Sequence, residues 1–360
     1  MSFFQNNQNA IGLDISDLTL RAVQFKGQGR GLAFEGYGQI DVPPGIIKNG
    51  EILEPRTVSD LIKRMISRPS FGRFSTKNVI ASLPERRSFI KALEIPQIDS
   101  QQLEVTIRQE MSQHVPFSAD EIYLDWQMFK SGASADTSRV LIGATPKSIV
   151  DSYIAALEDA DLRPVSLVIE SMAIAYALIP PNAEKNTSAM ILDIGLNRTS
   201  FLVFDQGAVR FSASSKVISG SAMTRLIAQK LNLTNDQAEE AKRLCGLDPT
   251  QGKAVIPKTL MPAIDQLAKQ IEKFLQFYKT HVPQANEISQ IILAGGGANL
   301  KNLTKVLSER LGRKVVLGNP WCQFEHLQKT KVIPSQQYLS QPTSFGLGLL
   351  GLANLSRKKK

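Results

Sequence analysis

The 360-residue chain contains 42% apolar and 21% charged residues, so it is long and apolar enough for two or three packed domains. No stretch approaches the about 20 apolar residues of a membrane-spanning helix, and the first ten residues, MSFFQNNQNA, lack the basic and apolar regions of a signal peptide. We therefore expect a cytoplasmic protein. Two separated cysteines and three histidines support neither a disulfide framework nor a zinc site.

The net charge of +9 is concentrated at the C-terminal end. Residues 301–360 contain 11 Lys or Arg and two Glu, so this segment alone carries a net charge of +9. The other residues are balanced, which argues against a nucleic-acid-binding surface spread over the fold. The basic residues 357–360 either form a solvated tail or attract an anionic membrane at about 1 kcal/mol per residue, and both interpretations stay open.

The first predicted element, residues 10–25, has a near copy at residues 189–204. The two segments read AIGLDISDLTLRAVQF and AMILDIGLNRTSFLVF. Each is an apolar strand that ends in an aspartate, Asp14 or Asp193, followed by a tight turn and a second strand, which predicts two β-hairpins. Corresponding places in the two halves indicate a duplicated domain whose hairpin tips face each other across a cleft. Turn amides bind anions and a nearby carboxylate holds a divalent cation, so the pattern predicts a nucleotide with magnesium.

The rest of the first half predicts an α/β unit. GLAFEGYGQIDV forms a third strand, Pro-Pro-Gly at 43–45 a turn, and apolar residues at helical spacing after the possible cap Thr57 a helix. NVIASLP is a buried strand that ends at Pro84. Residues 85–150 predict a small α+β insert with a strand, a helix that ends before Pro116 and two further strands.

The chain then resumes the first domain and crosses to the second half. KSIVDSYIAALEDADL and SMAIAYALI are predicted helices on either side of the strand RPVSLVIE, and the polar residues 182–188 form a linker. After the second hairpin and its third strand we expect a helix at SGSAMTRLIAQKL, a second capped by Thr234 or Asn235, and a long one at about 258–282.

A strand, QIILA, is followed by three glycines and a predicted helix opening. Residues 295–297 carry no Cβ atoms, so their backbone can approach a bound group closely, and a helix N-terminus behind them would favour an anion. A generic strand-to-helix turn explains the same pattern, and this alternative stays open.

The order of these motifs resembles the actin-like ATPase superfamily, which includes heat-shock chaperone ATPases, FtsA and MreB. Within it the chain is most similar to the PilM family, the cytoplasmic assembly proteins of type IV pili and of related type II secretion and competence systems. VPPGIIKNGEI at 42–52, LEIP at 93–96 and the closing helix TSFGLGLLGLANL carry this resemblance. It implies an α/β, actin-like (ribonuclease H-like) duplicated two-lobe fold with an inserted small α+β subdomain.

The resemblance also implies four parts. The first lobe (1A) takes residues 1–84, 151–184 and about 340–360, and the insert (1C-like) takes 85–150. The second lobe (2A) takes 185–220 and about 286–339, and a helical subdomain (2B) takes 221–285.

The implied cofactors are ATP and magnesium. Magnesium is held by Asp14 and Asp193, usually through water, and Glu170 polarises the attacking water. The nucleotide-binding residues carried over from the family are Asp14, Ser16, Asp17, Thr19, Asp193, Gly195, Asn197, Thr199, Gly220, Glu239, Lys242, Gly295, Gly296 and Gly297. Two alternatives stay open: Glu239 and Lys242, three residues apart on one helix face, form only a solvated ion pair worth about 0.3–0.5 kcal/mol, and Glu170 caps a helix.

Two positions depart from the family pattern. Ser16, followed by Asp17, stands where a glycine is usual, and Ser219 precedes Gly220 where two glycines are usual, while Thr224 is retained. Both changes weaken a γ-phosphate site more than an adenosine pocket. We therefore predict that nucleotide binds and that hydrolysis is slow or absent.

As function, the resemblance implies a scaffold of the inner-membrane pilus platform. Its partner is the cytoplasmic N-terminal segment of PilN, bound in a groove between the first domain and the 85–150 insert, alongside other platform proteins. Membrane contact is indirect, and whether the basic tail aids it and whether the protein self-associates both stay open. A filament-forming protein of the FtsA or MreB kind and a sugar kinase are the alternatives.

Overall fold

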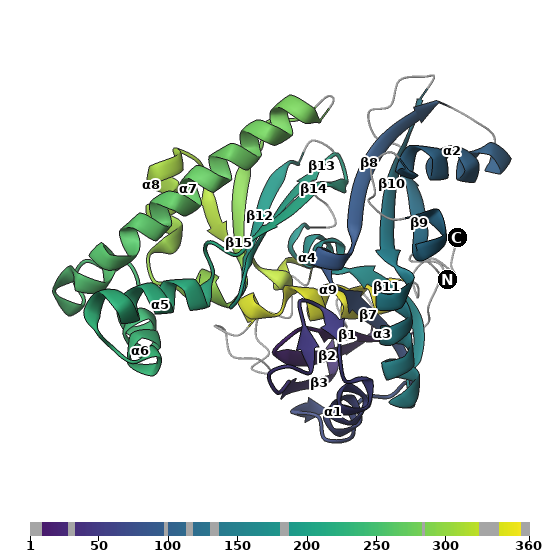
Figure 1. Cartoon of the computed structure of the whole chain (residues 1–360), viewed down its shortest axis with the longest axis horizontal. Helices are drawn as coiled ribbons and strands as arrows, with labels where there is room; N and C mark the ends of the chain where they lie inside the picture. Colours follow the sequence, from purple (N-terminus) through teal and green to yellow (C-terminus); the bar gives the residue numbers. More distant parts are fainter. Residues whose placement is uncertain are drawn as a thin grey trace. The chain divides into compact units, whose positions relative to one another are not determined.

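A computed structural model describes residues 9–27, 33–96, 100–112, 118–129, 137–180, 187–282, 285–323 and 338–353 (Figure 1). The chain divides into two compact units. The first comprises Met1–Pro181, Trp321–Val332 and Thr343–Lys360, and the second comprises Asn182–Pro320 and Ile333–Pro342. The finer four-part division stays a prediction.

The first unit contains a six-stranded sheet of order β11-β7-β1-β2-β3-β6. β1 pairs antiparallel with β2 and parallel with β7, which in turn pairs parallel with β11. Its strands are β1 (Ile11–Ile15), β2 (Thr19–Lys26), β3 (Ala33–Asp41), β6 (Phe71–Gly72), β7 (Asn78–Leu83) and β11 (Arg163–Ile169), and a small hairpin, β4 (Ile47–Lys48) and β5 (Glu51–Ile52), follows β3.

Helices cover both faces of this sheet because alternate strand residues point to opposite sides. Leu13, Val79 and Leu167 belong to a core that also contains residues of α1 (Pro55–Ser67) and α3 (Lys147–Asp159), which pack together. The opposite face meets α4 (Glu170–Leu178) and α9 (Pro342–Ala353).

The opposite face holds a close backbone contact. A Cβ atom on Gly12 would lie 2.1 Å from the backbone nitrogen of Gly348, and one on Gly346 would lie 1.9 Å from the carbonyl oxygen of Ala173. The glycines of the closing helix are therefore packing residues that allow α9 to lie directly against β1 and α4.

The predicted insert is an antiparallel sheet of order β8-β10-β9 with one helix. Its elements are β8 (Phe89–Pro96), α2 (Ser100–Ser112), β9 (Ile122–Phe129) and β10 (Thr137–Pro146), with 3₁₀ turns at Glu85–Arg87 and Ala119–Glu121. Ile107 and Met111 of α2 are buried against Ile95 and Ile142 of the sheet. The predicted helix stop at Pro116 lies outside the described residues.

The second unit repeats the central topology of the first, with a sheet of order β14-β13-β12-β15-β16. Its strands are β12 (Ala189–Ile194), β13 (Thr199–Asp205), β14 (Ala208–Ser215), β15 (Gln290–Ala294) and β16 (Val315–Leu317). Its helices are α5 (Gly220–Leu231), α6 (Asn235–Cys245), α7 (Val255–His281) and α8 (Leu303–Leu311), with 3₁₀ turns at Gly252–Ala254, Gly296–Asn299 and Tyr338–Ser340. A further 3₁₀ turn, Pro320–Gln323, lies where the sequence passes from the second unit to the first.

Three local expectations need correction or completion. Thr57 is not the cap of α1: the helix begins at Pro55, because proline suits the first helical position, and the Thr57 hydroxyl donates to the Glu54 carboxylate over 2.9 Å. Thr234 is the cap of α6 and forms a capping box with Gln237. The glycines do not open an α-helix directly, since a 3₁₀ turn intervenes and α8 begins at Leu303.

Linker residues 182–186 and the basic residues 357–360 lie outside the described ranges. Within the described ranges, we find no helix with the length and apolarity needed to cross a membrane.

Candidate functional site

Asp14 and Asp193 occupy the same register position in the two hairpins. Asp14 lies opposite Arg21 across the β1–β2 pair, and Asp193 lies opposite Ser200 across the β12–β13 pair. In each hairpin one further residue pair follows before the turn. The turns also close alike: the Ser16 amide donates to the Thr19 carbonyl over 3.1 Å, and the Gly195 amide to the Arg198 carbonyl over 2.8 Å.

The Asp14 carboxylate is buried and is surrounded by protein groups. It is 5% exposed, accepts a hydrogen bond from the Ser82 hydroxyl over 3.2 Å, and lies 3.7 Å from an Arg21 guanidinium nitrogen. Ser82 also accepts the Ile15 amide over 2.9 Å and so links β7 to β1. The protein itself therefore compensates part of the Asp14 charge. Sequence reasoning missed both partners, although Arg21 was signalled by its place opposite Asp14.

The first turn uses its polar side chains within the fold. The Ser16 hydroxyl donates to the Thr19 carbonyl over 2.8 Å and accepts the Thr19 amide over 3.3 Å. The Asp17 carboxylate accepts the amides of Asn49 and Gly50 over 2.9 and 2.8 Å. Asp17 thus holds the turn between β4 and β5, and any contact of Ser16, Asp17 or Thr19 with a nucleotide stays a prediction.

Glu170 is the first residue of α4 and directly follows β11. It is 9% exposed, and its carboxylate accepts the Glu85 amide over 3.4 Å. Because β1, β7 and β11 are parallel neighbours, Asp14, Ser82 and Glu170 all lie toward the same edge of the first sheet. The role of Glu170 in orienting water stays a prediction.

The second turn is bound to the start of α5. The Gly220 amide donates to the Gly195 carbonyl over 2.9 Å, and the Thr199 hydroxyl donates to the Ile218 carbonyl over 2.7 Å. The Ser221 hydroxyl lies 3.5 Å from the Asn197 side-chain oxygen. Ser219, the residue that departs from the family pattern, caps α5 by accepting the Ala222 amide over 3.2 Å.

Glu239 and Lys242 connect α6 to that same loop. The Lys242 ammonium is buried and donates to the Gly220 carbonyl, the Thr224 hydroxyl and the Glu239 carboxylate over 3.0, 2.8 and 2.6 Å. Its three donors are thereby matched by three protein acceptors. The side chains of Glu239 and Lys242 therefore belong to a partly buried network and are not a fully solvated ion pair.

The pKa of Glu239 reflects this network. Burial acts to raise it, but hydrogen bonds from Lys242 and Thr224, the charge of Lys242 and a bond from Arg243 together lower the pKa from 4.5 to about 2. Glu239 is therefore ionised at neutral pH.

The three glycines lie beside the second hairpin. Gly295 has φ +81°, and a Cβ atom there would lie 2.5 Å from a carboxylate oxygen of Asp193. A Cβ on Gly297 would lie 2.3 Å from the Ile194 side chain, whereas one on Gly296 would have only Ser340 nearby, at 4.0 Å. The second unit therefore brings together Asp193, the Gly195 turn, the Gly220 loop and residues 295–297. No group of three or more His, Cys, Asp or Glu suited to a metal occurs among the residues that the structure describes.

Comparison with known proteins identifies the family. The family model of the type IV pilus assembly protein PilM matches residues 12–353. The chain belongs to this PilM family. The structure of a PilM–PilN type IV pilus biogenesis complex is similar at a TM-score of 0.79 and 24% identity, covering 95% of this chain and 98% of that one.

More distant proteins share the fold. MreB5 of Spiroplasma citri bound to ADP gives a TM-score of 0.54 at 13% identity, covering 98% of this chain and 99% of that one. FtsA of Staphylococcus epidermidis is 25% identical over 196 residues, and that match spans 49% of this chain and 41% of FtsA. The predicted actin-like α/β fold is therefore confirmed, as is the predicted membership of the PilM family.

Proposed function

We propose that this protein is a cytoplasmic nucleotide-binding scaffold of the inner-membrane assembly platform of a type IV pilus, or of a related secretion or competence system. The observation that carries the proposal is the identical register of Asp14 and Asp193 in the duplicated hairpins of a PilM-family chain. Membership of the family supports the role in pilus assembly, and the two hairpins support the binding of a nucleotide.

The groups present in each unit fit ATP with magnesium. In the second unit, Asp193, the Gly195 turn and residues 295–297 would hold phosphate, adenosine and the cation. In the first unit, Asp14 is the carboxylate proposed for magnesium. The open space beside Gly296 leaves room for a close approach, whereas Cβ atoms on Gly195 and Gly220 would already meet protein atoms at 3.1 and 3.5 Å. When bound, magnesium would neutralise phosphate charge. Lys242 would act by fixing the Gly220 loop, because its ammonium is already fully hydrogen-bonded.

Slow or absent hydrolysis remains part of the proposal. The carboxylate of Glu170 accepts a backbone amide, and Arg21 faces Asp14, so both acidic groups are engaged by the protein. The nucleotide would then serve as a structural or switching ligand.

Isothermal titration with ATP and magnesium tests the nucleotide site. We expect saturable heat with the intact protein and a loss of about tenfold or more in affinity for Asp193→Asn. Asp236→Asn, an exposed carboxylate in the first turn of α6, is the matched control and should titrate like the parent. Absence of heat with the intact protein would refute the site, and brisk ATP turnover unaffected by Glu170→Ala would refute the hydrolysis part.

The proposed partner is the cytoplasmic N-terminal segment of a PilN-like membrane protein, bound by the first unit with its insert. The insert is attached to helix α3 of the first unit, where the Tyr123 hydroxyl donates to the Asp151 carboxylate over 3.0 Å. Its sheet ends in β9, where Met128 is 52% exposed. An insert that is held in place and presents an exposed edge strand is suited to binding a peptide.

Titration of a synthetic peptide from the PilN-like protein of the same organism tests the partner. Met128→Glu should weaken binding by about tenfold if the peptide lies along β9, while Val105→Glu, equally exposed but on α2, should not. Equal loss with both variants would contradict binding at β9.

Filament formation is a second candidate. It is favoured by the 25% identity to FtsA over 49% of this chain. Sedimentation with and without ATP separates the two, because a filament pellets in a nucleotide-dependent manner and a scaffold does not.

A further inference from the structure

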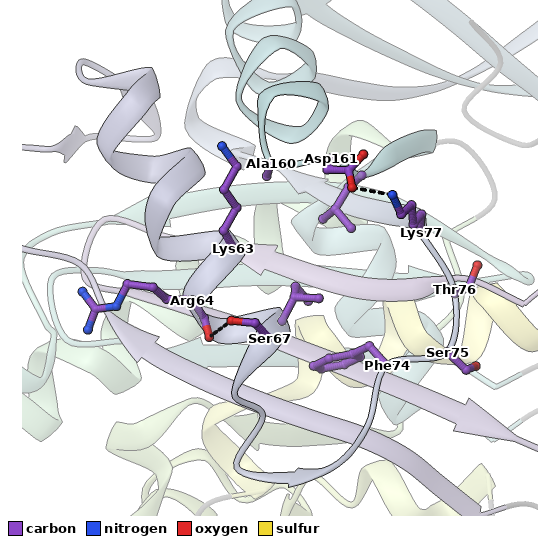
Figure 2. Close-up of a pocket in the computed structure, with 11 residues that line it drawn as sticks. Lys63, Arg64, Ser67, Phe74, Ser75, Thr76, Lys77, Ala160 and Asp161 are labelled. Atoms are coloured by element: carbon purple, nitrogen blue, oxygen red, sulfur yellow. Dashed lines mark hydrogen bonds and ion pairs between the residues drawn. The ribbon is translucent and has the colours of Figure 1, made fainter.

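A groove of about 760 Å³ lies on the first unit (Figure 2), and none of its lining residues belongs to the proposed nucleotide site. Three segments line it: the second half of α1, the loop at 74–77 before β7, and the turn at 160–162 between α3 and β11. Its volume lies within the range of about 300–1,000 Å³ typical of binding pockets. No residue of the 85–150 insert lines it, so it is separate from the proposed PilN-like site.

The groove combines an apolar floor with polar walls. Ile66 and Phe74 are half-buried and pack against the core of the first unit, and Leu162 is buried. Phe71, in the short strand β6 just before this loop, is 42% exposed. Figure 2 shows Lys63, Arg64 and Ser67 of α1 on one side, with Ser75, Thr76 and Lys77 on the other.

The charge around the groove is basic and only partly neutralised. Lys63 lies 3.8 Å from the Asp159 carboxylate, and Lys77 is paired with Asp161. Three exposed arginines on the lining or flanking segments have no carboxylate of the described residues within 4.0 Å, which is the distance of an ion pair. They are Arg64, Arg68 and Arg73.

We propose that this groove binds an acidic segment of a partner protein in which apolar side chains alternate with Asp or Glu. The apolar side chains would cover Ile66 and Phe74, and the carboxylates would meet the three arginines, which suit carboxylates through their planar donor fork. Arginine and aromatic residues carry much of the affinity of protein interfaces.

The shape and the charges select this occupant. An anionic membrane is flat and would reach the rim of the groove but not its apolar floor. The chain's own final residues 354–360 contain four basic and no acidic residues, so they would be repelled by the same arginines.

Fluorescence anisotropy with a labelled peptide of about 16 residues, in which Glu alternates with Leu and Phe, tests the proposal on the full chain. A copy with Lys in place of Glu controls for charge. We expect the acidic peptide to bind at low salt, the lysine copy not to bind, and affinity to fall several-fold when salt is raised to about 300 mM.

Two variants of the groove and one control variant make the test specific. Arg64→Glu with Arg73→Glu should weaken binding by about tenfold or more, and Ser67→Trp should do so by filling the groove without a change of charge. Lys258→Glu with Lys269→Glu, on exposed positions of α7, makes the same charge change elsewhere and should bind like the parent. Circular dichroism verifies the fold of each variant.

Three outcomes would overturn the proposal. The first is equal binding of the lysine copy, and the second is equal loss in the α7 variant. The third is binding of phosphatidylserine vesicles, but not of the peptide, that depends on Arg64 and Arg73, because this result would assign the surface to a membrane.

Discussion

The hairpins of the two units share the same strand register, but their acidic residues make different contacts. In the first unit Asp14 faces Arg21 and Ser82, and Asp17 accepts two hydrogen bonds from the turn between β4 and β5. In the second unit the position opposite Asp193 is Ser200, and the turn is bound to α5 and, through Lys242, to α6. The first turn is therefore anchored within its own sheet region, whereas the second is anchored to helices.

This difference shows how duplicated motifs diverge. Backbone topology and the place of the aspartate are retained, while the neighbours that set charge and mobility change. A helix-anchored turn moves only when its helices move, so we expect the second unit to respond more strongly to changes in the α5–α6 network.

Exchange of a single residue between equivalent strand positions should have the largest effect. Gly12 of β1 corresponds in register to Ile191 of β12. Gly12→Ile would drive a side chain into the backbone of α9 at Gly348, so we expect a loss of about 4 kcal/mol or more, or failure to fold. Thermal unfolding and soluble yield measure this. Gly143→Ala in β10, whose Cβ would meet only Ile169 at 3.4 Å, is the control and should be nearly neutral.

The glycine turn of the second unit should show the next largest effect. Gly295 and Gly207 have nearly equal φ of +81° and +83°, but a Cβ on Gly207 meets no atom within 4 Å. Gly295→Ala should cost about 3 kcal/mol because it adds a clash with Asp193 and Ile194, and Gly207→Ala should cost about 1 kcal/mol from backbone strain alone. Denaturant unfolding compares them, and equal costs would show that the contact with Asp193 is not retained in solution.

The α5–α6 network should make stability depend on pH. Because the folded pKa of Glu239 is about 2, below the ordinary 4.5, its stabilisation is fully present above pH 4.5 and is lost as pH falls toward 2. We expect Glu239→Gln to cost about 1–2 kcal/mol at pH 7, an estimate reduced for partial exposure, and progressively less below pH 4.5. Urea midpoints of the parent and variant give this difference, and a gap that widens on acidification would contradict it.

The smallest effect concerns the acid peculiar to the first turn. Asp17→Asn weakens two hydrogen bonds to the amides of residues 49 and 50, so we expect a cost of about 1 kcal/mol. An unchanged affinity for ATP would show that this carboxylate serves the fold alone. A large loss of affinity in titration calorimetry with intact stability would instead place Asp17 in the nucleotide site.

Much of the fold could be predicted from local patterns. The two hairpins, the insert and the capped helix α6 follow from strand alternation, turn residues and the Thr234 cap, all of which act over a few residues. The start of α1 was placed wrongly because Pro55 outweighs Thr57, and the glycines were expected to open a helix that begins only at Leu303.

The sequence indicated which residues to propose for the site, but it did not indicate their hydrogen-bond partners. The spacing of Glu239 and Lys242 indicated a pair on one helix face, whereas their link to Gly220 and Thr224 depends on how α6 packs on α5. Ser82 gave no local signal, since it lies 68 residues from Asp14.

The sequence by itself determined the duplicated strands and the aspartate at the end of each, because such features depend on residues close together along the chain. It also determined the family, because the order of the motifs along the chain is visible without the structure. Only the tertiary structure decided that Asp14 faces Ser82, that Asp17 binds the turn at 49–50, and that residues 63–77 and 160–162 form one basic groove. Such contacts depend on how distant segments pack, and packing is set by the whole core rather than by any local pattern.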